Sequence, residues 1–272
     1  MSGPYELIDI GPNLAHDSFQ DDLPAVLQRA QEAGVAQMVV TGSDAASARE
    51  ALRLAQQHPG LLFATAGLHP HHASDLDTDT LVLFRDLAQQ PGVVALGEMG
   101  LDFFRDISPR KDQEQAFHQQ LQLAVELNRP VFLHQRDAHE RFLPILKEYR
   151  EHIPAAVAHC FTGSEKELND YLDLDLHIGI TGWICDERRG AHLLDIVQSI
   201  PDNRLMLETD SPYLMPRTIR PRPKTRRNEP ANLPYVLATV AQVRKQSEAH
   251  VARATTATAR QFFGLEEPVT PG

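Results

Sequence analysis

The chain has 272 residues, 42% of them hydrophobic, so it can bury about three-quarters of its unfolded surface and fits one large α/β domain. Its net charge of −11 argues against a protein coated in nucleic acid, although a local basic groove is not excluded. The sequence shows no signal-peptide start and no run of about 20 apolar residues, and its two cysteines, Cys160 and Cys185, offer no disulfide framework. We therefore expect a cytoplasmic monomer without membrane contact.

Short apolar runs alternate along the chain with longer amphipathic segments. The runs predict eight strands. They are Tyr5–Ile10, Gln37–Thr41, Leu61–Ala66, Val93–Gly97, Pro130–Leu133, Ala155–Ala158, His177–Ile180 and Leu205–Leu207.

The segments between the runs have helical spacing. Phe117, Leu121 and Ala124 recur at intervals of three to four, and Ser164 with Glu167 forms a capping-box pattern before the helix that follows the sixth run. Such alternation predicts parallel strands, arranged either as a closed eight-stranded barrel or as an open doubly wound sheet.

Ionisable residues stand at the ends of four predicted strands. Glu98 ends the fourth, where Gly100 lets the backbone turn, His134 and His159 follow the fifth and sixth, and Asp210 lies just beyond the eighth. Closure of a barrel brings distant strand ends around one mouth, whereas an open sheet gathers them only near a switch point. The pattern therefore favours a TIM-type (β/α)8 barrel.

We expect one domain over residues 1–272, because no repeat or low-complexity tract interrupts the alternation. Helices from about residue 231 onward are predicted to pack on the outside of the barrel. The tail from Pro268 to Gly272 is expected to fray.

The residues at the strand ends predict a divalent-metal site. A single histidine after a strand is more often structural, but two imidazoles combined with two buried carboxylates are costly to bury without a metal or an imidazolium partner. The predicted ligands are Glu98, His134, His159 and Asp210. Carboxylate and water ligands favour Mg²⁺ or Mn²⁺, whereas imidazole favours Zn²⁺.

A basic segment from Arg217 to Arg227 contains six cations and no acid. Its prolines keep it extended, and it begins seven residues after Asp210, so it is either a groove that follows a nucleic-acid backbone or a solvated connector. Arg222, Lys224 and Arg226 are the cations that we assign to substrate binding.

Two further residues near predicted strand ends suit a nucleic acid. Arg136 can make a bidentate phosphate contact, or instead a salt bridge with Asp137 or Glu140. Trp183 can stack on a base, or can pack within a lid.

Seven motifs together resemble the TatD family of metal-dependent deoxyribonucleases. They lie in the family's order between residue 8 and about residue 263, and are Asp9–Leu14, Ala66–His71, Gly97–Phe103, His134–His139, His159–Gly163, Gly179–Trp183 and Glu208–Tyr213. The resemblance implies an amidohydrolase-like barrel that hydrolyses phosphodiesters with Mg²⁺, held by the four ligands named above. The stretches Cys185–Gly190 and Arg226–Ala231 resemble one branch of the family, described as 3′-to-5′ exonucleases on single-stranded DNA and RNA.

One position departs from the family pattern. Many members carry a His-x-His pair on the first strand, where this sequence has Gly11 and Asn13. Neither replaces an imidazole, although Asn13 and Asp9 have oxygen atoms to offer. We therefore expect one firmly bound ion, with a weaker second ion recruited by substrate.

Phosphodiester hydrolysis assigns roles to the remaining residues. Asp210 is predicted to act as ligand and base, with Glu208 holding it and Glu98 competing for the role of base. His69 and His71 are predicted to bind a phosphate oxygen or to protonate the leaving group, with a loop-capping imidazole as the alternative for His69.

We favour a metal-dependent exonuclease on single-stranded DNA or RNA, acting in DNA repair or nucleic-acid turnover. The first alternative is an ester or amide hydrolase on the same barrel, such as an aminoacyl-tRNA deacylase. The second is a non-catalytic nucleic-acid binder, which the survival of all four ligands disfavours.

Overall fold

The computed structural model describes residues 4–267, and within this range eight parallel strands form one sheet in sequence order. Each strand pairs with the next one along the chain. The strands are β1 (Leu7–Asp9), β2 (Val35–Val40), β3 (Leu62–Ala66), β4 (Val93–Asp102), β5 (Val131–Arg136), β6 (Ala156–Ala158), β7 (His177–Ile180) and β8 (Leu205–Leu207).

The sheet curls until β8 meets β1. The backbone N–H of Ile10 donates to the carbonyl oxygen of Leu207 at 3.3 Å, and the side chain of Asp9 accepts from the backbone N–H of Thr209 at 2.9 Å. These contacts nearly close the barrel, which confirms the (β/α)8 fold over the open sheet.

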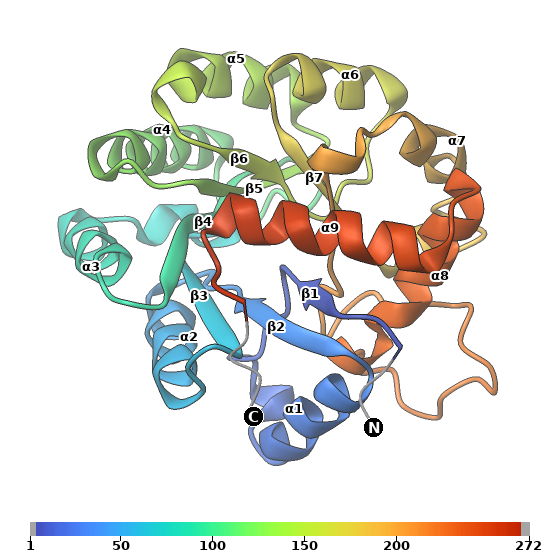
Figure 1. Cartoon of the computed structure of the whole chain (residues 1–272). Helices are drawn as coiled ribbons and strands as arrows, with labels where there is room; N and C mark the ends of the chain where they lie inside the picture. The colour runs from blue at the N-terminus through green and yellow to red at the C-terminus, as the bar shows by residue number, and fades with distance from the viewer. Residues whose placement is uncertain (1–3, 268–272) are drawn as a thin grey trace.

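Helices cover the outside of the barrel (Figure 1). Their apolar faces pack on the outward side chains of the strands, as Phe117 and Leu121 do, and the predicted capping box of Ser164 and Glu167 begins α6. The helices of the described part are α1 (Leu23–Glu32), α2 (Ala45–Gln57), α3 (Thr78–Ala88), α4 (Arg110–Leu127), α5 (His139–Tyr149), α6 (Glu165–Asp173), α7 (Leu193–Ile196), α8 (Leu233–Arg244) and α9 (Glu248–Phe263).

A second apolar cluster fills the inside of the barrel. Ile8, Val39, Phe132 and Met206 belong to this cluster, and so do Ala259, Phe262 and Phe263 near the C-terminal end of α9. Figure 1 shows α9 lying across the end of the barrel that faces the viewer. The amino-terminal end of the barrel is therefore plugged, which leaves the carboxyl ends of the strands as the open mouth.

Strand β4 is longer than the sequence predicts. It runs through Glu98 to Asp102 instead of stopping at Gly97, and β5 likewise continues to Arg136. Gly100 pairs with His134 in the ladder at a φ of +145°, and any side chain at this position would overlap the carbonyl oxygen of His134. The prediction that Gly100 marks a turn is therefore wrong, because this glycine permits close approach of two strands.

Among the described helices, none combines the length and the apolar character needed to cross a membrane. The predicted fraying of Pro268–Gly272 lies outside the described residues.

Candidate active site and metal-binding residues

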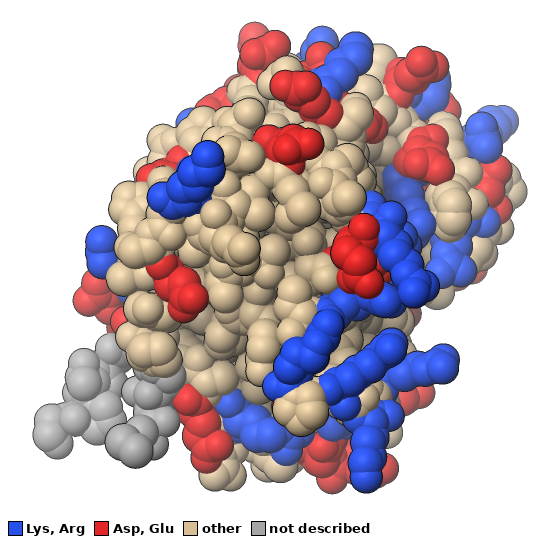
Figure 2. Space-filling model, turned by 90° about the vertical axis from the view of Figure 1, so that its right-hand side faces the viewer, with Lys and Arg blue, Asp and Glu red and all other residues tan. Residues whose placement is uncertain are grey.

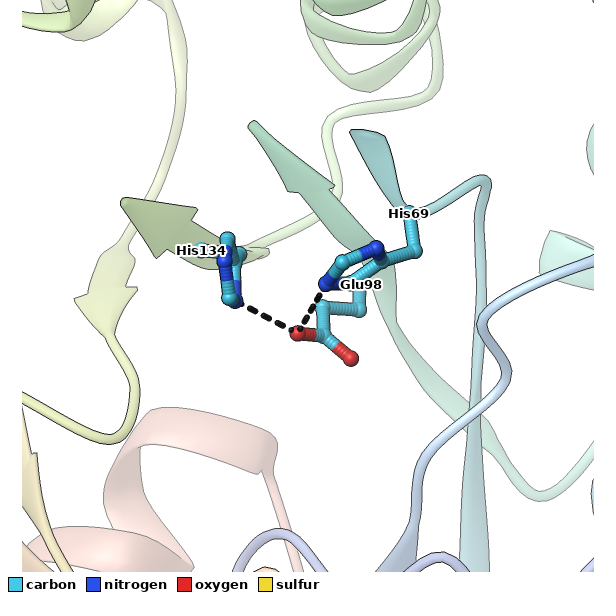
Figure 3. Close-up of side chains that lie close together, drawn as sticks. All are labelled: His69, Glu98 and His134. Atoms are coloured by element: carbon cyan, nitrogen blue, oxygen red, sulfur yellow. Dashed lines mark ion pairs between the residues drawn. The ribbon is translucent and has the colours of Figure 1, made fainter. Parts of the chain in front are cut away.

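Three imidazoles surround one carboxylate oxygen at the mouth of the barrel. Glu98 Oε1 lies 2.7 Å from His159 Nε2, 3.0 Å from His134 Nδ1 and 3.4 Å from His69 Nε2. Figure 3 shows the Glu98 carboxylate between the rings of His69 and His134. We call these four residues the mouth cluster; they come from β4, from β5 and from the segments that follow β3 and β6.

The charges in the mouth cluster are coupled. Burial alone would raise the pKa of Glu98, but its imidazole partners outweigh burial and hold that pKa well below the ordinary value. Burial alone would lower the pKa of His159, but Glu98 and Glu208 raise it well above the ordinary value. In the absence of a bound cation, His159 is therefore an imidazolium paired with the Glu98 carboxylate.

Glu208 contacts the His159 ring at Nδ1, the ring nitrogen that does not face Glu98. The sequence predicts that this carboxylate supports Asp210, but its Oε2 lies 3.3 Å from His159 Nδ1, and its Oε1 accepts the backbone N–H of Cys160. When Nδ1 donates to a carboxylate, the lone pair of Nε2 is available to a metal after the ring loses one proton. His159 therefore has the arrangement of a metal-ligating histidine.

His69 has the opposite arrangement. Its Nδ1 accepts the backbone N–H of His71 at 3.1 Å, so in the neutral ring the hydrogen resides on Nε2, which points toward Glu98. Burial lowers the pKa of His69 well below its ordinary value, so the ring is neutral. A neutral imidazole with its hydrogen on Nε2 is a hydrogen-bond donor rather than a ligand at that atom.

Asp102 is a site residue that the sequence reasoning missed. Its Oδ2 lies 2.9 Å from His71 Nε2 and 3.4 Å from His134 Nε2. The carboxylate is buried, and the histidines beside it help to outweigh burial and lower its pKa. Had β4 been extended in the prediction, the strand period of two would have placed Glu98, Gly100 and Asp102 on one face.

Asp210 is close enough to the mouth cluster for its charge to interact with those of His159 and Glu98. Its Oδ1 accepts a hydrogen bond of 3.0 Å from the side chain of Asn13. Burial raises the pKa of Asp210 to about 7, and the charges of Glu98 and Glu208 add to this effect while that of His159 opposes it.

The residues present fit a divalent cation. Side-chain atoms of His69, Glu98 and His134 that can bind a metal all lie within 4.8 Å of one another, and His69 would act as a ligand at Nε2 only after losing the hydrogen there. The buried Nε2 of His134 makes no well-aligned hydrogen bond within residues 4–267, since Asp102 Oδ2 at 3.4 Å is its nearest carboxylate oxygen. The set of imidazole nitrogens and carboxylate oxygens is one that divalent cations accept. The mouth cluster is therefore a candidate metal site.

Position 11 has no room for a further ligand. A Cβ atom at Gly11 would overlap Oε2 of Glu208. The other carboxylate oxygen of Glu208, Oε1, fills the space beside Gly179. Asp9, the other oxygen donor considered from the sequence, is bound by both the backbone and the hydroxyl of Thr209.

A cavity of about 370 Å³ opens beside His159 on the side of β5, β6 and β7. Arg136 and Trp183, both predicted to bind substrate, line it together with Phe104. The guanidinium carbon of Arg136 lies 3.9 Å from the ring centre of Phe104 and 5.7 Å from that of Trp183. We call this the aromatic cavity.

A second cavity, of about 530 Å³, opens on the side of β1 and β2. Asn13 and Tyr213 line it, and both also hydrogen-bond to Asp210, Asn13 through its side chain and Tyr213 through its backbone N–H. Because three of its lining residues are Asp17, Asp44 and Glu50, we call it the carboxylate cavity.

The basic segment 217–227 spans the rim. Figure 2 shows Lys and Arg side chains gathered on the side of the molecule that carries this connection. Arg217 pairs with Glu187 at 3.2 Å and Arg227 with Asp22 at 2.7 Å, which anchors both ends of the segment. Within residues 4–267, Arg222, Lys224 and Arg226 are exposed and have no acidic partner.

The chain is similar in sequence to known proteins over almost its whole length. The sequence model of the family described as "TatD related DNase" matches residues 8–264. A curated relative from Pantoea ananatis, named "3′-5′ ssDNA/RNA exonuclease TatD", is 50% identical over 259 residues, which cover 95% of this chain and 100% of the relative.

Solved structures share the fold. YjjV, a TatD homologue from Escherichia coli, has a TM-score of 0.87 at 29% identity, with 96% of this chain and 98% of that chain covered. An enamidase of the amidohydrolase superfamily has a TM-score of 0.61 at 13% identity, with 98% of this chain and 70% of that chain covered, and shows the fold alone. The predicted resemblance is confirmed: the chain belongs to the family of TatD-related DNases.

Proposed function

We propose that this protein is a divalent-metal-dependent exonuclease that degrades single-stranded DNA, and also RNA, from the 3′ end. The observation that carries the proposal is the mouth cluster, a set of buried ligands at the open end of a barrel and next to two cavities. The relative that is 50% identical over 95% of this chain and is named as such an exonuclease supports the substrate class and the polarity.

Glu98, His134, His159 and Asp210 would hold the cation. When bound, it neutralises charge on the phosphoryl oxygens and lowers the pKa of a water molecule toward neutrality. We propose Mg²⁺ as this ion, with Mn²⁺ or Zn²⁺ as the other cations that these ligands accept. One ion is held tightly, because Glu208 leaves no room for a ligand at Gly11, and a second binds more weakly.

Asp210, positioned by Asn13, takes a proton from the attacking water. The water oxygen bonds to phosphorus, and the bond from phosphorus to the O3′ atom of the upstream nucleotide breaks. His69 Nε2, which carries hydrogen, donates to a phosphoryl oxygen or protonates the departing O3′. Proton exchange with solvent then restores both side chains.

The substrate strand contacts residues around the mouth. His71, fixed by Asp102 at 2.9 Å, lies against the ring of His69 and is placed to contact phosphate. Arg136 is proposed to bind phosphate, Trp183 to stack on a base, and Arg222, Lys224 and Arg226 to follow the backbone.

The test uses end-labelled single strands with a phosphorothioate block at one end. After removal of metal, Mg²⁺ should restore degradation of the strand blocked at its 5′ end but not of the strand blocked at its 3′ end. Equal protection by both blocks would refute the polarity. Hydrolysis of aminoacyl-tRNA esters without any turnover of oligonucleotides would establish the ester hydrolase instead.

We also propose that the protein acts as a cytoplasmic monomer in DNA repair or nucleic-acid turnover. The compartment is supported by Cys160 and Cys185, which are both free thiols within residues 4–267. Light scattering of the pure protein at micromolar concentration tests the monomer.

A further inference from the structure

The carboxylate cavity has no role in the proposed hydrolysis of the phosphodiester bond. At about 530 Å³ it falls in the size range of small-molecule sites. It borders the reacting centre, because Asn13 both lines it and donates to Asp210 at 3.0 Å. A group in this cavity would therefore lie next to the phosphate being cleaved.

The lining of this cavity does not suit a phosphate. Among the described lining residues there are three carboxylates and two histidines, His16 and His72, but neither a lysine nor an arginine. Arg53, which lies outside the lining, pairs with Glu50, so the negative charge comes mainly from Asp17 and Asp44, the latter 4.0 Å from Nε2 of His72. Bringing a phosphate close to two carboxylates costs free energy at any dielectric constant between those of water and protein.

The same lining suits a neutral polar group. Thr41, a residue only 2% exposed, lines the cavity, and its buried hydroxyl has no hydrogen-bond partner within residues 4–267. Ser43, Gln20 and the phenol of Tyr213 add further donors and acceptors. Sugar hydroxyls and base edges offer complementary groups.

The aromatic cavity on the other side has a different character. Its walls hold Arg136 between Phe104 and Trp183, and Arg189 lies 4.4 Å from the ring centre of Trp183. Aromatic faces with guanidinium groups between them suit stacked nucleotides that keep their phosphates. The aromatic cavity therefore suits the part of the strand that continues upstream of the scissile phosphate. The carboxylate cavity suits only a part of the strand that carries no further phosphate.

We infer that the carboxylate cavity binds the terminal nucleoside of the strand, and that Asp17 and Asp44 exclude any strand that carries a phosphate on its 3′ end. The inference rests on the proposed exonuclease activity and gives it a physical origin. A continuing strand would bring another phosphate into the cavity, so only a chain end with a free 3′-hydroxyl fits.

The free 3′-hydroxyl that the cavity requires also fixes which ester bond can break. Cleavage between phosphorus and the upstream O3′ releases a nucleoside 5′-monophosphate and leaves a new 3′-hydroxyl, which the cavity accepts in the next cycle. Cleavage on the other side of phosphorus would leave a 3′-phosphate, which the cavity would reject after one turnover.

The test compares three single strands of one sequence that end in a 3′-hydroxyl, a 3′-methoxy group or a 3′-phosphate. With the intact chain and Mg²⁺, the 3′-phosphate strand should be degraded at least about tenfold more slowly than the 3′-hydroxyl strand. The 3′-methoxy group adds size without charge. The 3′-methoxy strand should therefore be degraded at a rate nearer to that of the 3′-hydroxyl strand than to that of the 3′-phosphate strand.

The decisive variant is Asp17→Asn combined with Asp44→Asn, because asparagine caps a helix as well as aspartate and so preserves the start of α2. It should reduce the ratio of 3′-hydroxyl to 3′-phosphate rates to about threefold or less. Asp173→Asn, on an exposed face of α6, is the matched control and should keep the ratio of the natural chain.

Equal rates on the 3′-hydroxyl and 3′-phosphate strands would overturn the inference alone. A ratio that does not change in the double variant would also overturn it, since the discrimination would then come from elsewhere. No degradation of the 3′-hydroxyl strand would instead refute the proposed exonuclease, and the inference with it.

Discussion

Glu208 contacts His159 through Nδ1 at 3.3 Å, on the side of the imidazole ring away from the mouth of the barrel. Glu208 itself is fully buried between two glycines, so it cannot turn away. The pair fixes both the orientation of the ring and the nitrogen that carries hydrogen. Such carboxylate–histidine pairs tune the affinity of a metal site without touching the metal.

Replacing Glu208 with Gln should therefore weaken metal binding. The amide is close in size but supplies no charge to His159, so the Mg²⁺ concentration that gives half-maximal activity should rise about 10- to 100-fold. The same titration on Glu151→Gln, an exposed position, serves as control. An unchanged half-saturating concentration would show that Glu208 only fills space.

The variants His134→Ala and His69→Ala should both lose turnover, but only His134→Ala should need more metal. Loss of His134 as a ligand should reduce turnover at least about 100-fold and raise the metal requirement. Loss of His69, which donates from Nε2, should reduce turnover by about 10² to 10⁴ at an unchanged metal requirement. Circular dichroism should show an intact fold in both, and His152→Ala, at an exposed position, should behave as the natural chain.

A rise in the metal requirement of His69→Ala equal to that of His134→Ala would make His69 a ligand. The hydrogen on its Nε2 would then have to leave on metal binding.

The barrel was predictable because buried parallel strands are short apolar runs, and all eight runs became strands of the sheet. The full length of β4, which runs to Asp102, was not predictable from the sequence. A charged residue such as Glu98 ends an apolar run in the sequence, but the strand continues because its carboxylate is neutralised by histidines from other strands. These contacts depend on the tertiary structure, so the residues next to Glu98 in the sequence give no sign of them.

The partner of Glu208 could not be predicted for a similar reason. Its contact with His159 depends on the space that Gly11 and Gly179 leave beside the carboxylate. The role of Asn13 as a hydrogen-bond donor to Asp210 likewise depends on the meeting of β1 and β8. Asn13 and Asp210 are 197 residues apart in the chain, as are Gly11 and Glu208. Only closure of the barrel brings such residues together.

The number of tightly held ions is a further prediction. Because a side chain at Gly11 would overlap Glu208, the protein should retain about one ion per chain after desalting. Elemental analysis of the desalted protein measures this. Two ions per chain at full occupancy would mean that other oxygen atoms, such as those of Asp9 or Asn13, replace the missing imidazoles.

Acid should destabilise the protein through His177, far from the mouth. Burial, with the nearby charge of Arg204, lowers the pKa of His177 to about 4, and its ring packs on Phe262. Since the unfolded chain binds this proton more readily, stability is lost as the pH falls from about 6.5 toward 4. After discounting for partial exposure, the loss between pH 7 and pH 5 should be about 1 kcal/mol.

Urea unfolding of His177→Phe at both pH values tests this, because phenylalanine keeps the contact with Phe262 but cannot bind a proton. The variant should lose less stability on acidification than the natural chain. His58→Asn removes a histidine from the end of α2 and serves as control. An identical pH dependence in the natural chain and His177→Phe would contradict the prediction.

The last prediction concerns the basic segment. Of its six cations, Arg217 and Arg227 are paired with acids and Arg220 donates to backbone carbonyls, which leaves Arg222, Lys224 and Arg226 available among the described residues. With Arg136 these make four phosphate contacts, so the logarithm of affinity for a single strand should fall with log salt at a slope near −2.8. Binding should then weaken about 50-fold from about 50 to 200 mM salt.

Changing Arg222, Lys224 and Arg226 to Ala should reduce the slope to about −0.7, so that the same increase in salt weakens binding only about threefold. The metal requirement should not change, because the segment lies on the rim. A charge-matched control replaces Arg85, Lys147 and Arg253, which lie on α3, α5 and α9, and should keep the slope of the natural chain. If both triple variants gave the same slope, the segment would be a connector and the strand would be held elsewhere.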